Sequence, residues 1–274
     1  MKKTSNITFD WHYLTGKIPF RMTNDYLFRA LMQENNNVLT AITASLLGWK
    51  KADITEATIE NPIMLGATLE QKDFILDVRV LINNKITMNL EMQVVDESNW
   101  PERSLVYLCR IFDKINQGER YQDMRPAHHI GITSFKLFPE NPEFYATYKL
   151  MNQKNFQKYT DKFALSVLCL PYLNKATEED KASCLDEWAL MFAATKWEDL
   201  RMLAQKNPDI DNAITTMFKL SNDNIIKEQM QAREDYYTMQ RSLSKLIDDQ
   251  QKEIEDQQKE IADLKKQLAE AQKS

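Results

Sequence analysis

The chain of 274 residues is long enough for one large domain, or for one domain with an appendage. A hydrophobic fraction of 43% supports a packed core, and a count of only 5 glycines argues against glycine-rich phosphate-binding loops. The formal net charge of -5 argues against a general nucleic-acid coat, although a local basic groove is compatible with it.

The N-terminus carries two lysines but no apolar stretch of the kind that a secretory signal needs. No apolar run elsewhere approaches the roughly 20 residues that span a bilayer. The three cysteines, Cys109, Cys169 and Cys184, are far apart and odd in number, so they predict neither a zinc knuckle nor a disulfide framework. We therefore expect a cytoplasmic protein with no membrane partner and with reduced cysteines.

The first helical region is predicted from a cap and from apolar spacing. Thr23 or Asn24 is placed to cap a helix that begins near Asp25. Apolar residues then recur at helical spacing until Gly48, which suits a helix end because glycine adopts the left-handed conformation easily. The polar stretch at residues 34–37 predicts a turn that interrupts this region.

Strands and helices follow in a mixed order. Runs of apolar and β-branched residues predict strands, and the proline at position 101 suits the first turn of a helix. The predicted elements are strands at residues 54–66, 73–82 and 86–95, a helix at 101–116, strands at 128–135, 145–151 and 163–170, and helices from residue 178 onward. This order predicts a mixed α/β core.

A heptad repeat marks the C-terminal tail. DQQKEIE, DQQKEIA and DLKKQLA follow one another, and one seam repeats every seven residues at Ile247, Ile254, Ile261 and Leu268. The companion seam holds Leu243, Gln250, Gln257 and Leu264. The pattern predicts a coiled coil that joins copies of the chain through residues 243–268, and the alternative is a lone charged helix. We accordingly divide the chain into an arm at 1–20, an α/β domain at 21–175, a helical region at 176–240 and the tail at 241–274.

The segment FILDVRVLINNKITMNLEMQ, residues 74–93, alternates apolar and polar residues in two runs. A two-residue turn between the runs would put their apolar sets on opposite faces of the sheet. A three-residue loop at 83–85 pairs Ile82 with Ile86 and keeps one continuous apolar face, and such loops are common. We therefore predict a hairpin with a three-residue loop.

That register places Asp77 directly opposite Glu91 on the polar face, with their Cβ atoms roughly 5 Å apart. Two ionised carboxylates this close repel each other, and a bound cation removes the repulsion. Mg²⁺ binds one or two carboxylates together with backbone oxygens and waters, and it stabilises charge on a phosphate. Gln93 faces the same side and can hold a water or a phosphate oxygen. The pattern predicts a metal site, and the alternative is a solvated polar sheet face.

Several stretches of the chain resemble one nuclease family. They are NDYLFRALM, KDFILDVRV, NLEMQ, RSLVYLCRIFDKINQGERY and HHIGITSF, within roughly residues 20–240. An aspartate followed by E-x-Q on two adjacent strands, between two helices, is similar to the PD-(D/E)XK nucleases, and most closely to their Rpn-type (recombination-promoting nuclease-like) transposase group. The resemblance implies a restriction-endonuclease-like core of helix, three strands, helix and further strands. It also implies cleavage of DNA phosphodiester bonds that depends on Mg²⁺ or Mn²⁺.

By this resemblance, Asp77 and Glu91 match the metal ligands, and the backbone carbonyl of Met92 adds an oxygen. Asp25 matches an acidic position in the first helix and is a candidate outer ligand, although a carboxylate is also favoured at any helix N-terminus. Gln93 stands where most nucleases of this fold carry lysine. Glutamine cannot stabilise a transition state as a cation, but it can donate a hydrogen bond to the attacking water.

The helix after the hairpin has a polar face suited to DNA. Arg103, Tyr107, Arg110 and Lys114 follow one another at helical spacing. Arginine binds phosphate with two parallel hydrogen bonds, and tyrosine stacks on a base or donates to phosphate. Because acidic residues are interspersed, a solvated helix face is the alternative.

The three histidines, His12, His128 and His129, are expected to have structural roles. His128 and His129 are neighbours in a predicted strand, so their side chains point to opposite faces and cannot easily share a metal ion.

Two functions fit the sequence. The first is a metal-dependent DNA endonuclease linked to recombination or mobile DNA, with Asp77, Glu91 and Gln93 as catalytic residues. The second is a catalytically weak or inactive nuclease-fold protein that binds DNA or partners and assembles through its coiled coil. Gln93, the acidic net charge and the weakly basic helix face favour the second function.

Overall fold

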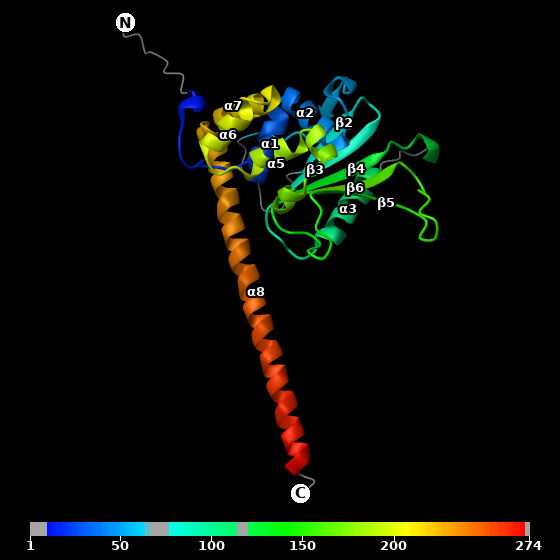
Figure 1. Ribbon diagram of the computed structural model, residues 1–274, viewed down its shortest axis with the longest axis vertical. Coiled ribbons are helices and arrows are strands. Elements are labelled where there is room, and N and C mark those ends of the chain that lie inside the picture. The colour runs from blue at the N-terminus through cyan, green and yellow to red at the C-terminus, as the bar shows by residue number, and fades with distance from the viewer. Residues whose placement is uncertain (1–9, 64, 66–76, 114–119, 272–274) are drawn as a thin grey trace. The chain divides into compact units, whose positions relative to one another are not determined.

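The computed structural model describes residues 10–63, 65, 77–113 and 120–271 (Figure 1). A six-stranded sheet lies at its centre, with strand order β1-β2-β3-β4-β6-β5. The strands are β1 (Ala57–Ile59), β2 (Val78–Ile82), β3 (Ile86–Gln93), β4 (Ala127–Thr133), β5 (Tyr145–Lys149) and β6 (Phe163–Cys169). β3, β4 and β6 run parallel, whereas β1, β2 and β5 pair antiparallel with their neighbours. The chain therefore has the mixed α/β core that the sequence predicts.

Helices cover both faces of the sheet (Figure 1). On one face, α1 (Asp25–Glu34) and α2 (Asn36–Leu47) contact the strands, and α5 (Leu185–Ala193) and α7 (Pro208–Ser221) pack on these helices. α6 (Trp197–Ala204) packs on α5 and α7, and α3 (Trp100–Phe112) covers the other face. The short α4 (Glu178–Ala182) precedes α5, and α8 (Asn224–Ala271) ends the described chain. The helical character predicted from residue 178 onward is confirmed.

Local side-chain caps set the ends of the first two helices. The side chain of Asn24 accepts a hydrogen bond from the N-terminal turn of α1, which begins at Asp25. Asn35 ends α1 and caps α2 in the same way, within the predicted interruption at residues 34–37. Gly48 ends α2 with a φ of 66°, the left-handed conformation that glycine adopts without strain.

The β2–β3 hairpin has the predicted register. Ile82 pairs with Ile86, and Val80 pairs with Met88. Asn83 and Asn84 in the loop take the left-handed conformation, with φ of 49° and 53°. The three-residue loop is therefore confirmed, and it keeps the apolar side chains of both strands on one face.

Each face of the sheet has its own core. The larger core joins the apolar face of the hairpin to α1, α2, α5 and α7. The smaller core lies under α3 and contains Trp100, Leu108, Ile111, Ala127, Leu165 and Val167. Because both faces are covered, the polar residues Thr87, Asn89 and Glu91 of β3 are buried. The alternative of a solvated polar face is therefore wrong.

Two predicted elements differ in extent from the structure. β1 occupies only the middle of the predicted strand at 54–66. The predicted strand at 73–82 begins, as far as the structure describes it, at Val78, because residues 73–76 lie outside the described part. Residues 114–116 of the helix predicted at 101–116 also lie outside it.

Contacts divide the chain into one unit at Met1–Arg233 and a second at Glu234–Ser274. In the first unit, residues 10–20, which we expected to be part of an arm, bury Trp11, Ile18 and Phe20. The indole of Trp11 donates a 3.0 Å hydrogen bond to Thr215 in α7. The boundaries predicted at residues 20, 175 and 240 stay a prediction.

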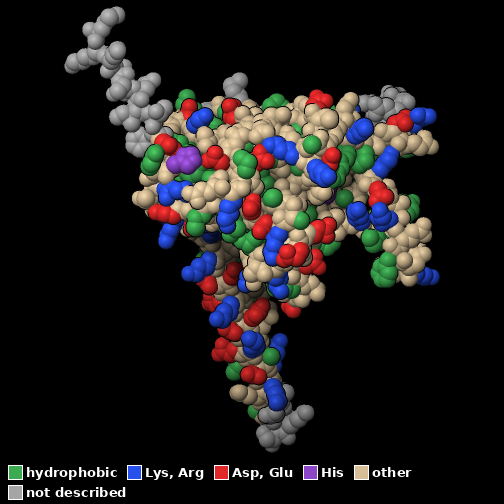
Figure 2. Space-filling view, turned by 45° about the horizontal axis from the view of Figure 1, so that its top comes forward, with side chains coloured by type: hydrophobic (Ala, Val, Ile, Leu, Met, Phe, Trp, Pro, Cys, Tyr) green, Lys and Arg blue, Asp and Glu red, His purple; other side chains and the backbone are tan. Residues whose placement is uncertain are grey.

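The second unit consists of the C-terminal part of α8. Its apolar seam residues are exposed by 46–63%, and they are Leu243, Ile247, Ile254, Ile261, Leu264 and Leu268. Charged side chains of both signs cover this part of the helix (Figure 2). The helix is present, and its pairing into a coiled coil stays a prediction. Among the described residues, no helix combines the length and the apolar character that crossing a membrane requires.

Gly131 in β4 lies directly beneath the indole of Trp100. A Cβ atom at this position would lie 2.0 Å from Trp100 Cζ2, much closer than non-bonded atoms approach. We expect Gly131→Ala to reduce the free energy of unfolding by about 3 kcal/mol, because overpacking forces neighbouring groups apart. Urea denaturation of Gly131→Ala, Trp100→Ala and the double variant measures this. The double variant should lose less than the sum of the single losses, and additive losses would contradict the contact.

Candidate active site

The polar side of the hairpin meets α3 and β4 in a buried cluster. Asp77 immediately precedes β2 and is 4% exposed, and Glu91 in β3 is 5% exposed. Val78 pairs with Leu90, so the next position along the ladder places Asp77 opposite Glu91. Both carboxylates thus belong to the sheet face that α3 covers.

Glu91 is held by Arg103 from α3. The Nε and Nη2 atoms of Arg103 lie 2.9 and 2.8 Å from the Glu91 Oε1 atom, while its Nη1 atom lies 3.6 Å from Glu97. Burial raises the pKa of Glu91 to about 7; the charge of Arg103 opposes this rise, and the charge of Asp77 adds to it. Glu91 therefore changes its protonation near neutral pH.

Two arginines act electrostatically on Asp77. Burial raises its pKa, and the positive charges of Arg29 and Arg79 oppose that rise. Arg29, in α1, is completely buried and donates to the backbone carbonyl of Asn61. The Asn61 side chain in turn donates to the backbone carbonyl of Asp77 at 3.1 Å. Within the described residues, the Nε and Nη1 atoms of Arg29 have no hydrogen-bond partner.

His129, which we expected to have a structural role, also belongs to the cluster. β4 runs parallel to β3, and the His129 Nδ1 atom lies 3.1 Å from the amide nitrogen of Asn89. Because Nδ1 accepts this hydrogen bond, we assign the ring proton to Nε2, which lies 3.7 Å from Glu91 Oε2. Burial lowers the pKa of His129 to about 3, so the ring is neutral. Tyr107 stacks on it with ring centroids 5.8 Å apart.

The other two histidines are held away from this cluster. The His128 Nε2 atom lies 2.7 Å from the Ser166 hydroxyl, and burial lowers the pKa of His128 to about 4. The His12 ring contacts Asp10 and Asp211. Neither contact involves Asp77 or Glu91.

The structure does not gather all the other predicted site residues around the two carboxylates. The amide nitrogen of Gln93 donates to the Val95 carbonyl at 2.9 Å. Asp25 forms an ion pair with Arg233, in which Arg233 Nε lies 2.8 Å from Asp25 Oδ1, and the charge of Asp25 also adds to the rise in the Glu91 pKa. The Met92 side chain is buried in the larger core.

The predicted DNA-binding stripe on α3 is only partly exposed. The Arg103 guanidinium lies 5.4 Å from the centre of the Tyr107 ring and is engaged by Glu91. Arg110 is exposed and lies 5.8 Å from the same ring. Lys114 lies outside the described residues. Two of these four residues, Arg103 and Tyr107, therefore contact the cluster itself.

The donor set suits a hard divalent cation. In the part of the chain that the structure describes, the buried oxygens without a hydrogen-bond partner include three in this cluster: Asp77 Oδ1, Asn89 Oδ1 and Glu91 Oε2. No group of three or more His, Cys, Asp or Glu side chains among the described residues could hold a metal. Two carboxylates with amide or backbone oxygens match Mg²⁺, which retains several waters, better than they match zinc.

A comparison with known protein families shows to which of them the chain belongs. The sequence profile of one family, described as PD-(D/E)XK nuclease family transposase, matches residues 22–246. The chain belongs to this family. The match includes the hairpin, α3 and β4, which together build the cluster around Asp77 and Glu91, and PD-(D/E)XK nucleases generally use divalent metal ions. No curated protein and no solved structure matches the chain.

The raised pKa of Glu91 predicts a pH-dependent stability. The pKa is 4.5 in an ordinary glutamate and about 7 here, so the folded state holds this proton more tightly than the unfolded state. The stabilisation is complete below about pH 4.5 and is lost as the pH rises to about 7. Relative to Glu91→Gln, the protein should lose on the order of 3 kcal/mol over this range.

Urea denaturation in EDTA at several pH values measures the difference. The histidines with lowered pKa values are present in both proteins, so their contribution cancels to first order. Parallel stability curves for the two proteins would contradict the prediction.

Proposed function

We propose that this member of the PD-(D/E)XK nuclease family is an Mg²⁺-dependent DNA endonuclease that acts in recombination or on mobile DNA. The observation that supports this most directly is the placement of Asp77 and Glu91 on one buried face, each with an oxygen that has no hydrogen-bond partner in the described chain. Unpaired buried carboxylate oxygens are costly, and a bound cation would compensate them. The family profile supplies the second support.

Asp77, Glu91 and the Met92 carbonyl would hold the Mg²⁺ or Mn²⁺ ion. When bound, such an ion makes a coordinated water more acidic and neutralises charge on the phosphate. Arg103 turns from Glu91 to a phosphate oxygen of the DNA, since a guanidinium suits either partner. Tyr107 and Arg110 hold the adjoining backbone, and Lys114 stays a predicted DNA contact. The neutral His129 ring lies beside the site, with its Nε2 atom 3.7 Å from Glu91 Oε2.

Gln93 stands where most nucleases of this fold carry lysine, so the site lacks the positive charge of that lysine. The positive charges of Arg29 and Arg79, which oppose the rise in the Asp77 pKa, are the candidates to replace it. Gln93 then orients the attacking water through its side-chain oxygen, while its nitrogen keeps the hydrogen bond to Val95. The charge needed next to the scissile phosphate thus comes from α1 and β2 rather than from the end of β3.

Plasmid nicking tests the proposed activity. Purified full-length protein incubated with supercoiled plasmid and Mg²⁺ should yield open-circular DNA, and EDTA should prevent this. The absence of nicking with both Mg²⁺ and Mn²⁺ would overturn the proposal.

A second candidate function is DNA binding without cleavage. Two hydrogen bonds favour it. The Gln93 side chain donates to the Val95 carbonyl, and the Arg103 side chain donates to the Glu91 carboxylate. Such a protein would retard plasmid DNA in a gel without nicking it under any divalent ion. The same assay therefore separates the two candidates.

We also propose that the tail pairs two copies of the chain. Isoleucine in the first seam favours two strands when leucine fills the companion seam, as it does at two of the four positions there. Full-length protein should then have twice the 32.2 kDa chain mass in light scattering, and a chain ending at Ser242 should be a monomer. Ile254→Asn keeps the full length and should also weaken the pairing, because it places an amide in the apolar seam. Identical masses for the full-length and shortened chains would exclude this role.

A further inference from the structure

The connection from β5 to β6 forms an exposed surface at the sheet edge farthest from β1 and β2. Residues 147–159 are all exposed. Five of them are large apolar side chains with exposed fractions of 45–83%: Tyr148, Leu150, Met151, Phe156 and Tyr159. Clusters of exposed apolar side chains on soluble proteins mark binding surfaces. We call residues 147–162 the β5–β6 hairpin.

The tip of the β5–β6 hairpin is an ordered turn. The backbone nitrogen of Tyr159 donates to Leu150 at 3.0 Å, and that of Phe156 donates to Asn152 at 2.8 Å. Phe156 has a φ of 57°, a left-handed conformation that aromatic residues rarely adopt. This conformation leaves the Phe156 ring 76% exposed, so backbone strain accompanies the presentation of an aromatic ring to solvent.

The β5–β6 hairpin is basic although the chain is acidic. Residues 147–162 contain four lysines and one aspartate, a net charge of +3, whereas the whole chain has -5. Lys149 and Lys158 both pair with Asp161, and their Nζ atoms lie 3.9 and 2.5 Å from its Oδ1 atom. Within the described chain, Lys154 has no ion-pair partner. A partner for this surface therefore combines negative charge with flat apolar groups.

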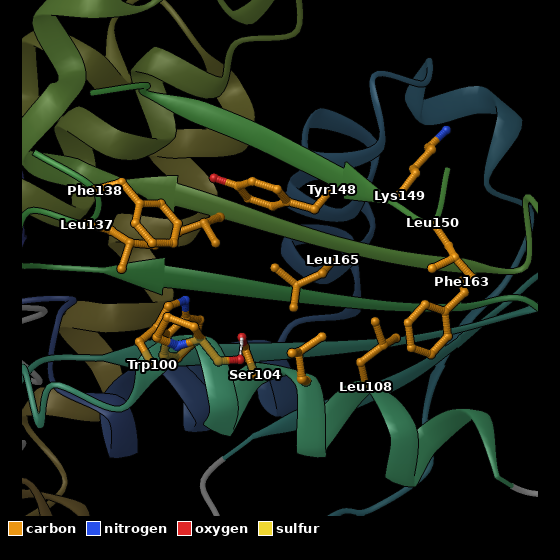
Figure 3. A pocket seen from close by; sticks show the side chains of 13 residues that line it. Trp100, Ser104, Leu108, Leu137, Phe138, Tyr148, Lys149, Leu150, Phe163 and Leu165 are labelled. Atoms are coloured by element: carbon orange, nitrogen blue, oxygen red, sulfur yellow. Dashed lines mark hydrogen bonds between the residues drawn. The ribbon is translucent and has the colours of Figure 1, made fainter. Parts of the chain in front are cut away.

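A cavity of about 290 Å³ adjoins the hairpin between α3 and the strands β5 and β6 (Figure 3). Tyr148 and Leu150 of the hairpin form one side, and Trp100, Leu105 and Leu108 of α3 form another. Ligand cavities usually exceed about 300 Å³, so this one suits a single ring system rather than a large ligand. The same helix that holds Glu91 through Arg103 thus lines this cavity with its other face.

We propose that the β5–β6 hairpin and the adjoining cavity bind single-stranded DNA. Unpaired bases offer flat faces on which Phe156 and Tyr159 stack, and lysines bind the phosphates between them. The cavity accepts one further base against Tyr148. In a duplex the bases are already stacked on each other, so the exposed rings would have no partner. The choice of DNA among polyanions rests on the proposed nuclease function.

Binding to labelled probes tests the proposal without cleavage. The full chain carrying Asp77→Asn is titrated in EDTA with an oligothymidylate of about 20 nucleotides, with a duplex of equal length and with an oligouridylate. The oligothymidylate should bind about 10-fold more tightly than the duplex and at least as tightly as the oligouridylate. Phe156→Ala and Tyr159→Ala, added singly, should each weaken its binding about 10-fold. Tyr13→Ala is the matched control, because Tyr13 is 84% exposed and Tyr159 is 83% exposed.

The lysine is tested separately from the rings. Lys154→Ala should weaken binding and reduce the dependence of log Kd on log salt by about 0.7, the value for one phosphate contact on a single strand. Lys206→Ala, at another exposed position, should leave both quantities unchanged.

Three results would overturn the proposal. The first is equal binding by Phe156→Ala, Tyr159→Ala and Tyr13→Ala. The second is a preference for the duplex or for oligouridylate. The third is binding to phosphatidylserine-containing vesicles without binding to DNA, which would identify a membrane surface instead. Plasmid nicking by the protein without Asp77→Asn tests the nuclease function independently, so the two failures are distinguishable.

Discussion

Asp77→Asn and Glu91→Gln should each reduce the rate of plasmid nicking in Mg²⁺ by about 10³-fold. Each substitution keeps the shape of the side chain and removes one negative oxygen from the proposed cation site. Because the two carboxylates act as a unit, the double variant should be no worse than the slower single variant. First-order rates of loss of supercoiled plasmid measure all three.

The controls separate lost chemistry from lost folding. Glu102→Gln changes an exposed carboxylate on the first turn of α3 and should nick within about 3-fold of the unchanged protein. Glu91→Gln should remain folded, since it imitates the protonated form that burial favours. Folded variants at both positions that nick at the normal rate would exclude Asp77 and Glu91 from the reaction.

Arg103→Ala should reduce nicking at about pH 7 by about 100-fold and should recover part of the rate at about pH 9. Arg103 opposes the rise that burial causes in the Glu91 pKa, so its removal moves that pKa further above about 7. Glu91 is then protonated at neutral pH and cannot bind a cation until the solution is more alkaline. Arg103→Lys keeps the positive charge but lacks the paired hydrogen-bond donors. Its nicking rate at about pH 7 should lie between those of the unchanged protein and Arg103→Ala.

Arg110→Ala is the matched control for this prediction. Arg110 lies near the same Tyr107 ring as Arg103 but forms no ion pair with Glu91 in the described chain. It should weaken DNA affinity without changing the pH profile. An Arg103→Ala profile parallel to that of the unchanged protein would show that Arg103 does not act through Glu91.

The sequence was most informative where structure is local. The Asn24 cap, the glycine at the end of α2 and the hairpin register follow from interactions between residues close in sequence, and the structure has all three. The family was also evident, because its motifs lie on the hairpin and on the helices next to it. The roles of Asp77, Glu91 and Gln93 stay predictions that the nicking assays test.

The rest of the cluster depends on contacts that the alternation of apolar and polar residues along a strand cannot reveal. His129 reaches Glu91 because β4 pairs in parallel with β3, and the register of a parallel pair is not fixed by a tight turn. Arg29 reaches Asp77 from the first helix, far away in the sequence. Gly131 was the one residue whose type indicated a close contact in this region. A glycine inside a strand often marks a place where another group lies close to the backbone, and here that group is the Trp100 indole.

The bond between Asp25 and Arg233 has a consequence for how the protein is made. The two residues are 208 positions apart, and Trp11 and Thr215 are 204 apart. At about 5 to 20 residues per second, a ribosome needs about 10 to 40 s to pass from the first residue of the pair to the second. The hairpin with its two carboxylates is synthesised early in this interval, but the first helix must wait for its partner. A prematurely terminated chain would therefore contain Asp77 and Glu91 without Arg233, the ion-pair partner of Asp25 in the first helix.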